Sequence, residues 1–109
     1  KIVVTGATGH LGTATCRLLT ERGHEVVGLS SKDALPALGG GVALLHLAAW
    51  HPPATAATTA DDRRQLLEVN VFGTMKVLEA AREKRAYEGR VACASDSAER
   101  LAQEIAKEL

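Results

Sequence analysis

Aromatic residues are scarce in this chain, which has one Trp, one Tyr and one Phe among its 109 residues. Surfaces that bind single-stranded nucleic acid stack bases on aromatic side chains, so this scarcity argues against such a surface. The 13 basic residues balance the 13 acidic ones, and the resulting formal net charge of zero gives no support for a nucleic-acid or membrane partner. No apolar run approaches the roughly 20 residues that a bilayer requires.

Cysteine is rare as well, with only Cys16 and Cys93. They fall in a predicted helix and a predicted strand, where burial as small apolar side chains is favoured over a disulfide or a catalytic thiol. The four histidines lack metal-ligand spacing, so no metal site is expected. His46 has apolar neighbours and is expected to be a hydrogen-bonded core residue. No signal peptide is visible, which favours a cytoplasmic protein. The chain begins at Lys1 rather than Met, which favours a missing start.

The most informative segment is a glycine-rich turn, residues 4–12 (VTGATGHLG). It follows an apolar run that is typical of a buried strand, and it opens a segment with helical periodicity. In such a turn Gly6 permits a sharp bend, Gly9 permits close approach of a pyrophosphate, and Gly12 permits close packing of helix on strand. The free N–H groups of the helix attract an anion. The turn therefore predicts dinucleotide binding, with Thr8, His10 and Leu11 as further contacts; a purely structural tight turn is the alternative.

Strands and helices alternate along the chain. Strands are predicted at 1–5, 25–29, 42–47 and 90–94, and helices at 11–22, 62–85 and 97–109, with one helical turn near 33–38 and a loop at 51–60. This order predicts an α/β fold: a doubly wound, Rossmann-like parallel sheet in three αβα layers, forming one shortened domain over residues 1–109. The expected strand order is 2-1-3-4, and a ligand should bind where the winding reverses, between the first and third strands.

Four segments, in order along the chain, resemble motifs of the extended short-chain dehydrogenase/reductase family, the NAD(P)-dependent epimerases and dehydratases. Residues 5–12 are similar to its TGxxGxxG turn, 46–49 (HLAA) to the end of its fourth strand, 70–82 to its NVxGTxxVLEAAR helix, and 91–95 to the strand that carries its catalytic serine. The resemblance implies a cofactor domain of an epimerase/dehydratase or reductase. It also implies hydride transfer between the nicotinamide and a nucleotide sugar or a similar polar alcohol.

The chain also departs from that family. The family's YxxxK pair is missing, since Val91 stands four residues after the only tyrosine, Tyr87, and Tyr87 precedes the serine strand. The usual substrate domain is absent, and the interval from Gly12 to His46 is short. Three explanations stay open: a longer enzyme with omitted segments, which the abrupt passages near 38–42 and 94–98 favour, a truncated or minimised domain, or a natural relative that binds NAD(P) without turnover. A domain that keeps the fold but binds no ligand is a weaker alternative.

Cofactor preference depends on the end of the second strand, where NAD-binding proteins usually carry an acidic residue. Here Ser30, Ser31 and Lys32 occupy that corner. Two hydroxyls and a cation suit a 2′-phosphate, so NADP is favoured over NAD. The alternative is that the two serines only cap the following turn.

Three further sites are predicted partly from the family resemblance. Ser95 is expected at the substrate as the family's catalytic serine, or else as the N-cap of the last helix. Asn70 is a poor helix former within a long helix, so its amide is expected to serve the cofactor site. The resemblance implies cofactor contacts from the backbone after the third strand, at Leu47, Ala48 and Ala49, although small residues there also suit tight packing.

The helix at 62–85 is longer than a four-stranded sheet needs. In the family the equivalent helix pairs across a dimer, so a homodimer is possible here. Its apolar side chains are nevertheless expected to lie mainly in the core: Val69, Phe72, Met75, Val77 and Leu78.

Overall fold

The computed structural model describes residues 1–36, 42–54, 57–83, 103 and 107. Within these residues three strands form one parallel sheet: β1 (Ile2–Thr5), β2 (Val26–Leu29) and β3 (Ala43–His46), in the order β2-β1-β3. Thr5, the last residue of β1, lies opposite Leu29 on one side and His46 on the other. The parallel sheet and the order 2-1-3 are as predicted. The predicted strand at 90–94 and most of the helix at 97–109 lie outside the described residues.

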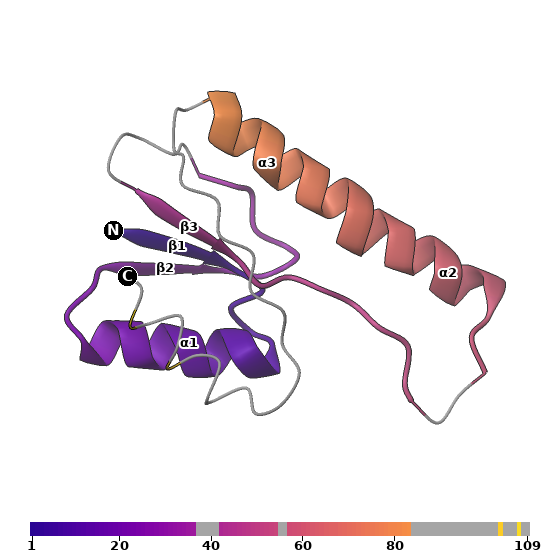
Figure 1. Cartoon of the computed structure of the whole chain (residues 1–109), viewed down its shortest axis with the longest axis horizontal. Helices are drawn as coiled ribbons and strands as arrows, with labels where there is room; N and C mark the ends of the chain where they lie inside the picture. Colours follow the sequence, from indigo (N-terminus) through magenta and orange to yellow (C-terminus); the bar gives the residue numbers. More distant parts are fainter. Residues whose placement is uncertain (37–41, 55–56, 84–102, 104–106, 108–109) are drawn as a thin grey trace.

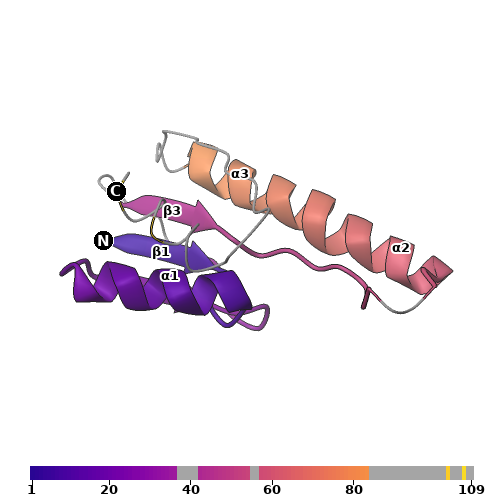
Figure 2. The same cartoon turned by 60° about the horizontal axis from the view of Figure 1, so that its bottom comes forward.

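Helices cover both faces of this sheet, as the three-layer prediction requires. Helix α1 (His10–Glu21) lies on one face, and a long helix ending in α3 (Gly73–Glu83) lies on the other; Figure 1 and the turned view in Figure 2 show the same layers. Side chains of β1 alternate between the two sides. Ile2 and Val4 pack with Leu19 of α1, whereas Val3 packs with Leu29 and Ala81 of α3. All four β1 residues are buried, which explains the continuous apolar run of the first three, Ile2, Val3 and Val4.

Helix α1 begins and ends one residue before the predicted range of 11–22. It ends in a left-handed glycine, Gly23 at φ +82°, whose N–H bonds to Thr20, while the N–H of His24 bonds to Leu19. These two bonds form a Schellman motif, as expected of glycine after a helix. Cys16 of α1 is half-buried beside the core, and burial raises the pKa of its thiol. Its role as a small apolar side chain agrees with the prediction, while Cys93 lies outside the described residues.

The long helix consists of α2 (Ala60–Leu66), a π-helical segment η1 (Leu67–Phe72) and α3. It begins at Ala60, before the predicted residue 62, because Thr59 is the N-cap. The Thr59 hydroxyl accepts from the N–H of Asp62, and the Asp62 carboxylate accepts from the N–H and hydroxyl of Thr59. This capping box lowers the pKa of Asp62, chiefly through the backbone bond. The predicted end at 85 lies beyond the described residues.

Two other predictions need correction. No helical turn forms over residues 33–36; the chain makes a turn in which the N–H and hydroxyl of Ser30 donate to the carboxylate of Asp33. The second and third strands are also shorter than 25–29 and 42–47, since β2 begins at Val26 and β3 spans Ala43–His46. None of the described helices is both long enough and apolar enough to span a membrane.

Candidate dinucleotide-binding site

The glycine turn lies at the carboxyl end of β1 and leads into α1. Gly6 adopts φ +71°, a left-handed conformation that favours glycine. The N–H of Gly9 bonds to the carbonyl of Gly6 at 3.0 Å, and the N–H of Thr13 bonds to the carbonyl of Gly9 at 2.9 Å. Gly9 is the N-cap of α1 and provides no side-chain cap, and the first turn of α1 has no acidic residue. The positive end of this helix is therefore not neutralised by its own first turn.

Two of the glycines are required by close backbone approach. A Cβ on Gly6 would lie 2.6 Å from the nitrogen of Ala48, and a Cβ on Gly12 would overlap the carbonyl oxygen of Gly6. Both neighbours are backbone atoms, so neither can move aside cheaply. Gly9 differs, because a Cβ there would meet only the Gly6 oxygen at 3.2 Å.

The predicted contacts of the turn divide by exposure. Thr8, Gly9 and His10 are exposed, whereas Leu11 is partly buried and Gly12 is fully covered. The exposed group lies at the N-terminus of α1, where a ligand can reach its N–H groups.

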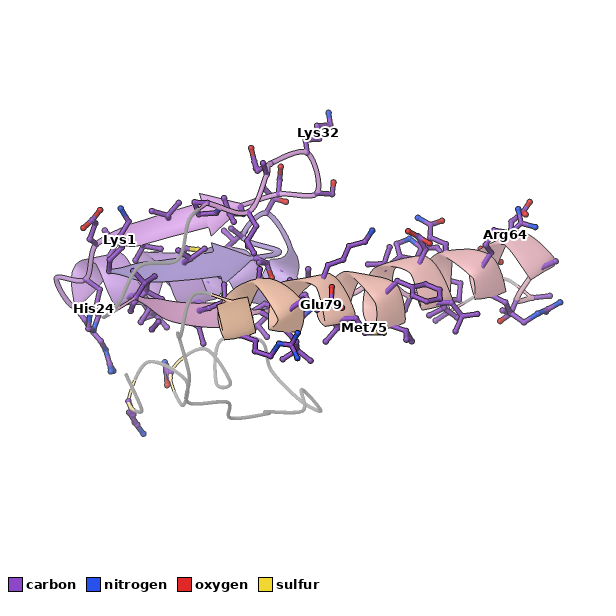
Figure 3. All side chains as sticks on the ribbon, turned by 90° about the horizontal axis from the view of Figure 1, so that it is seen from above. Lys1, His24, Lys32, Arg64, Met75 and Glu79 are labelled. Carbon is purple, nitrogen blue, oxygen red and sulfur yellow. The ribbon has the colours of Figure 1, made fainter. Side chains whose placement is uncertain are left out.

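The end of β2 lies beside this turn. The N–H of Ala7 bonds to the carbonyl of Leu29 at 3.1 Å. Beyond it, Ser30 is partly buried and Lys32 is exposed, projecting from the loop in Figure 3. A carboxylate does occur at this corner, since Asp33 accepts two 2.7 Å bonds from Ser30, which hold the pKa of Asp33 below its usual range. Asp33 was not among the predicted residues, although a serine followed three residues later by an aspartate is typical of such local side-chain bonding.

The segment after β3 also lies beside the glycine turn. The N–H of Leu47 bonds to the carbonyl of Thr5 at 3.1 Å, and Ala48 lies against Gly6. Leu47 and Ala48 are partly buried, and Ala49 is exposed. The structure thus brings together three predicted regions, namely the glycine turn, the β2 corner and the segment after β3, at the carboxyl ends of the three strands.

A chain of polar side chains connects the sheet to the long helix. His46 Nδ1 lies 2.6 Å from the hydroxyl of Thr5, and His46 Nε2 lies 3.0 Å from the hydroxyl of Thr74. Thr74 donates its single hydroxyl hydrogen to the carbonyl of Asn70 at 2.7 Å, so it accepts from His46 Nε2–H. Counting hydroxyl hydrogens in this way assigns His46 as the neutral Nε2–H tautomer, with Thr5 donating to Nδ1.

His46 is therefore the hydrogen-bonded core histidine expected from the sequence. Burial lowers its pKa, which favours the neutral ring that these contacts require.

Asn70 faces the segment after β3. Its Nδ2 donates to the carbonyl of Trp50 and its Oδ1 accepts from the N–H of Trp50, both at 2.7 Å. The sequence singled out Asn70 but not this partner, which lies 20 residues earlier in the chain. Ser95, the predicted catalytic residue, lies outside the described residues.

The comparisons with known proteins agree with this fold. Residues 2–99 match the model of the NAD dependent epimerase/dehydratase family. No curated protein matches the sequence. Among solved structures, the chain is similar to a short-chain dehydrogenase/reductase superfamily protein from Agrobacterium tumefaciens with bound NAD, at 22% identity and a TM-score of 0.59, covering 98% of this chain and 43% of the other.

A second similar structure is MoeE5 in complex with UDP-glucose and NAD, at 19% identity and a TM-score of 0.58, covering 99% of this chain and 47% of the other. The chain thus spans less than half the length of either protein. At these identities the two likenesses establish the fold, a Rossmann-like αβα arrangement. The family match extends over most of the chain and carries the assignment further: the chain belongs to the NAD-dependent epimerase/dehydratase family.

Proposed function

We propose that this chain is the dinucleotide-binding part of an NAD(P)-dependent epimerase/dehydratase or reductase of the cytoplasm. The observation that carries the proposal is the uncapped, exposed N-terminus of α1, placed by Gly6 and Gly12 at the carboxyl ends of the strands. Unpaired N–H groups and the positive helix end favour an anionic ligand there. The bound nicotinamide would supply hydride transfer, and the residues of this chain would hold and orient it.

The predicted site residues fall into groups, and each group has its own role in this proposal. The backbone at Gly6, Thr8 and Gly9, continuing through His10, Leu11 and Gly12, would hold the pyrophosphate. Leu47, Ala48 and Ala49 would border a ribose, because they lie beside the turn and two of them carry only a methyl group. Ser95 would bond the reacting hydroxyl or carbonyl of the substrate.

The choice between NADP and NAD depends on the β2 corner. Ser31 and Lys32 are exposed and offer a hydroxyl and a cation to a 2′-phosphate, which supports NADP. The donors of Ser30, however, already serve the Asp33 carboxylate. NADP binding would therefore require this turn to open or would depend on Ser31 and Lys32 alone.

A nucleotide sugar is the substrate class we propose. Support comes from the similar structure of MoeE5, which holds UDP-glucose together with NAD. Reduction of bound NAD or NADP by a UDP-sugar, followed at 340 nm with the full-length protein, would test this part.

Calorimetry with NAD and NADP tests the binding step directly. We expect saturable binding of at least one dinucleotide to the wild type. Gly9→Val should weaken it at least about tenfold, because a branched side chain would stand where the diphosphate approaches the backbone. Gly73→Ala, a glycine substitution on the opposite face of the sheet, is the control and should leave the affinity unchanged. No heat of binding at millimolar dinucleotide, or equal affinity in Gly9→Val, would refute the proposal.

A homodimer through the long helix is also proposed. Contrary to the expectation of a core position, Phe72, Met75 and Leu78 are exposed, as are Leu67 and Val71, each by 46–55%. The spacing of 67, 71, 75 and 78 places four of them in one stripe along the helix. An antiparallel second copy packed on this stripe would bury both stripes.

Sedimentation tests this dimer. Wild-type protein should sediment as a dimer at micromolar concentration, and Met75→Lys should sediment as a monomer. The matched control, Gln65→Lys, adds the same charge elsewhere on the helix and should remain dimeric. A monomeric wild type would contradict the dimer and leave the cofactor proposal intact.

A further inference from the structure

Both polar atoms of the Asn70 side chain bond the backbone of a single residue, Trp50. The amide oxygen and nitrogen bond the N–H and carbonyl of Trp50, both at 2.7 Å and in a partly buried setting. Only Asn and Gln side chains offer a neutral acceptor and donor on neighbouring atoms, so they can pair with backbone as an adjacent strand does. The contact is therefore a two-point clamp on the backbone of Trp50.

The backbone of Asn70 is itself held in place by hydrogen bonds. Asn70 lies in the π-helical segment η1, a type of distortion that occurs frequently at functional sites. Its carbonyl accepts from Thr74, which in turn accepts from His46 at the end of β3. The backbone of Asn70 is thereby connected to the sheet, while its side chain reaches toward the segment after β3.

That segment is short and held at both ends. At its start the N–H of Leu47 bonds to Thr5, and at its end Trp50 is held by Asn70. Between them Ala48 lies so close to Gly6 that a Cβ on Gly6 would be 2.6 Å from the Ala48 nitrogen. The path of residues 47–50 therefore determines how the glycine turn is covered on this side.

We infer that Asn70 is a positioning residue for dinucleotide binding: it holds residues 47–50 against the glycine turn through the backbone of Trp50. This inference rests on the proposed function. It differs from a direct cofactor contact because the amide acts through the backbone of Trp50. Without the clamp, dinucleotide binding would have to order this segment, and the affinity would fall by the cost of that ordering.

The first experiment replaces the amide by a side chain of similar shape. Asn70→Leu should weaken NAD or NADP binding about tenfold, equivalent to 1.4 kcal/mol. Trp50 is the only tryptophan in the chain, so its fluorescence and its backbone amide resonance report on the clamp directly. Both signals should change in Asn70→Leu. The control Gln65→Leu makes the same kind of change at an exposed position of α2 and should alter neither the signals nor the affinity.

The second experiment separates positioning from general helix stability. In Asn70→Asp, the ionised carboxylate can accept from the N–H of Trp50 but has no hydrogen to donate to its carbonyl. Asn and Asp have nearly the same shape, so at neutral pH this substitution removes one of the two clamp bonds and keeps the packing of the helix. At pH 7, where the carboxyl group is ionised, Asn70→Asp should therefore weaken dinucleotide binding and alter the Trp50 signals. A role in helix packing alone would leave both unchanged.

The outcomes distinguish the two proposals. If wild-type protein binds neither NAD nor NADP, the proposed function fails and the role in binding fails with it. If wild type binds but Asn70→Leu leaves the Trp50 signals or the affinity unchanged, the inference alone is overturned. Wild-type affinity in Asn70→Asp at pH 7 also overturns it.

Discussion

Gly12 and Gly73 allow a matched pair of substitutions, because both lie in helices and neither has a positive φ. What differs is the space for a methyl group. At Gly12 a Cβ would overlap the carbonyl oxygen of Gly6, whereas at Gly73 the nearest atom is the carbonyl oxygen of Glu68 at 3.6 Å, an ordinary contact. The same chemical change should therefore have opposite effects on stability at the two sites.

The magnitudes follow from two terms. Replacing glycine by alanine within a helix gains about 1 kcal/mol. At Gly73 nothing opposes that gain, so Gly73→Ala should raise the free energy of unfolding by about 0.5–1 kcal/mol. At Gly12 the overlap is with backbone, and forcing extra volume into such a contact costs about 1–3 kcal/mol or more. Gly12→Ala should lower the free energy of unfolding by about 2 kcal/mol.

Urea denaturation followed by circular dichroism measures both changes, with the fluorescence of Trp50 as a second probe of two-state behaviour. The two variants should differ by about 3 kcal/mol, and only Gly12→Ala should lose dinucleotide affinity. Gly12→Ala as stable as wild type would refute the close approach of α1 to the glycine turn. Gly73→Ala less stable than wild type would refute the space assigned to that site.

Three further predictions concern polar groups. Thr15 is fully buried and its hydroxyl has no partner in the described structure, so Thr15→Val should raise the free energy of unfolding in urea by about 1 kcal/mol. Burial lowers the pKa of His46 from its ordinary 6.5, so the unfolded chain binds the proton first. Stability should therefore fall as the pH drops from 6.5 through the lower native pKa and be constant above; His46→Gln should flatten this dependence in urea titrations between pH 8 and 5. Asp33→Asn removes a charge beside Ser30 and weakens its internal bonds, so calorimetry should show a higher ratio of NADP to NAD affinity; an unchanged ratio would contradict this.

The fold was predictable from local pattern. A continuous apolar run predicts a strand buried on both faces, and β1 is such a strand. The glycine turn and Gly23 delimit α1 by backbone chemistry, which acts within a few residues. The buried stripe of α1 was less visible, because Gly12, Thr15 and Leu19 form it, and neither glycine nor threonine marks an apolar face in a sequence.

The details of the site depended on distant contacts. Asn70 was identified because asparagine is unusual within a helix. Its partner is the backbone of Trp50, and because every residue carries the same backbone groups, the sequence could not indicate which one it bonds. The exposure of Met75 and Leu78 also escaped prediction, since helical spacing shows which side chains share a face but not what covers that face. Asp33 was not predicted because it lies four residues beyond the end of β2, and only its bonds to Ser30 bring it to the corner.

The contacts of the glycines separate those that shape the turn from the one that serves a ligand. Gly6 approaches Ala48, Gly12 approaches Gly6, and a Cβ on Gly28 of β2 would lie 2.8 Å from the Cβ of Ala7. These three approaches are needed to pack the turn between its neighbours whether or not a dinucleotide binds. Gly9 is exposed and has no such neighbour apart from the Gly6 oxygen. Substitutions at Gly6 or Gly12 must therefore change stability and affinity together, whereas a substitution at Gly9 that lowers affinity at nearly constant stability would isolate the anion-binding role of the turn.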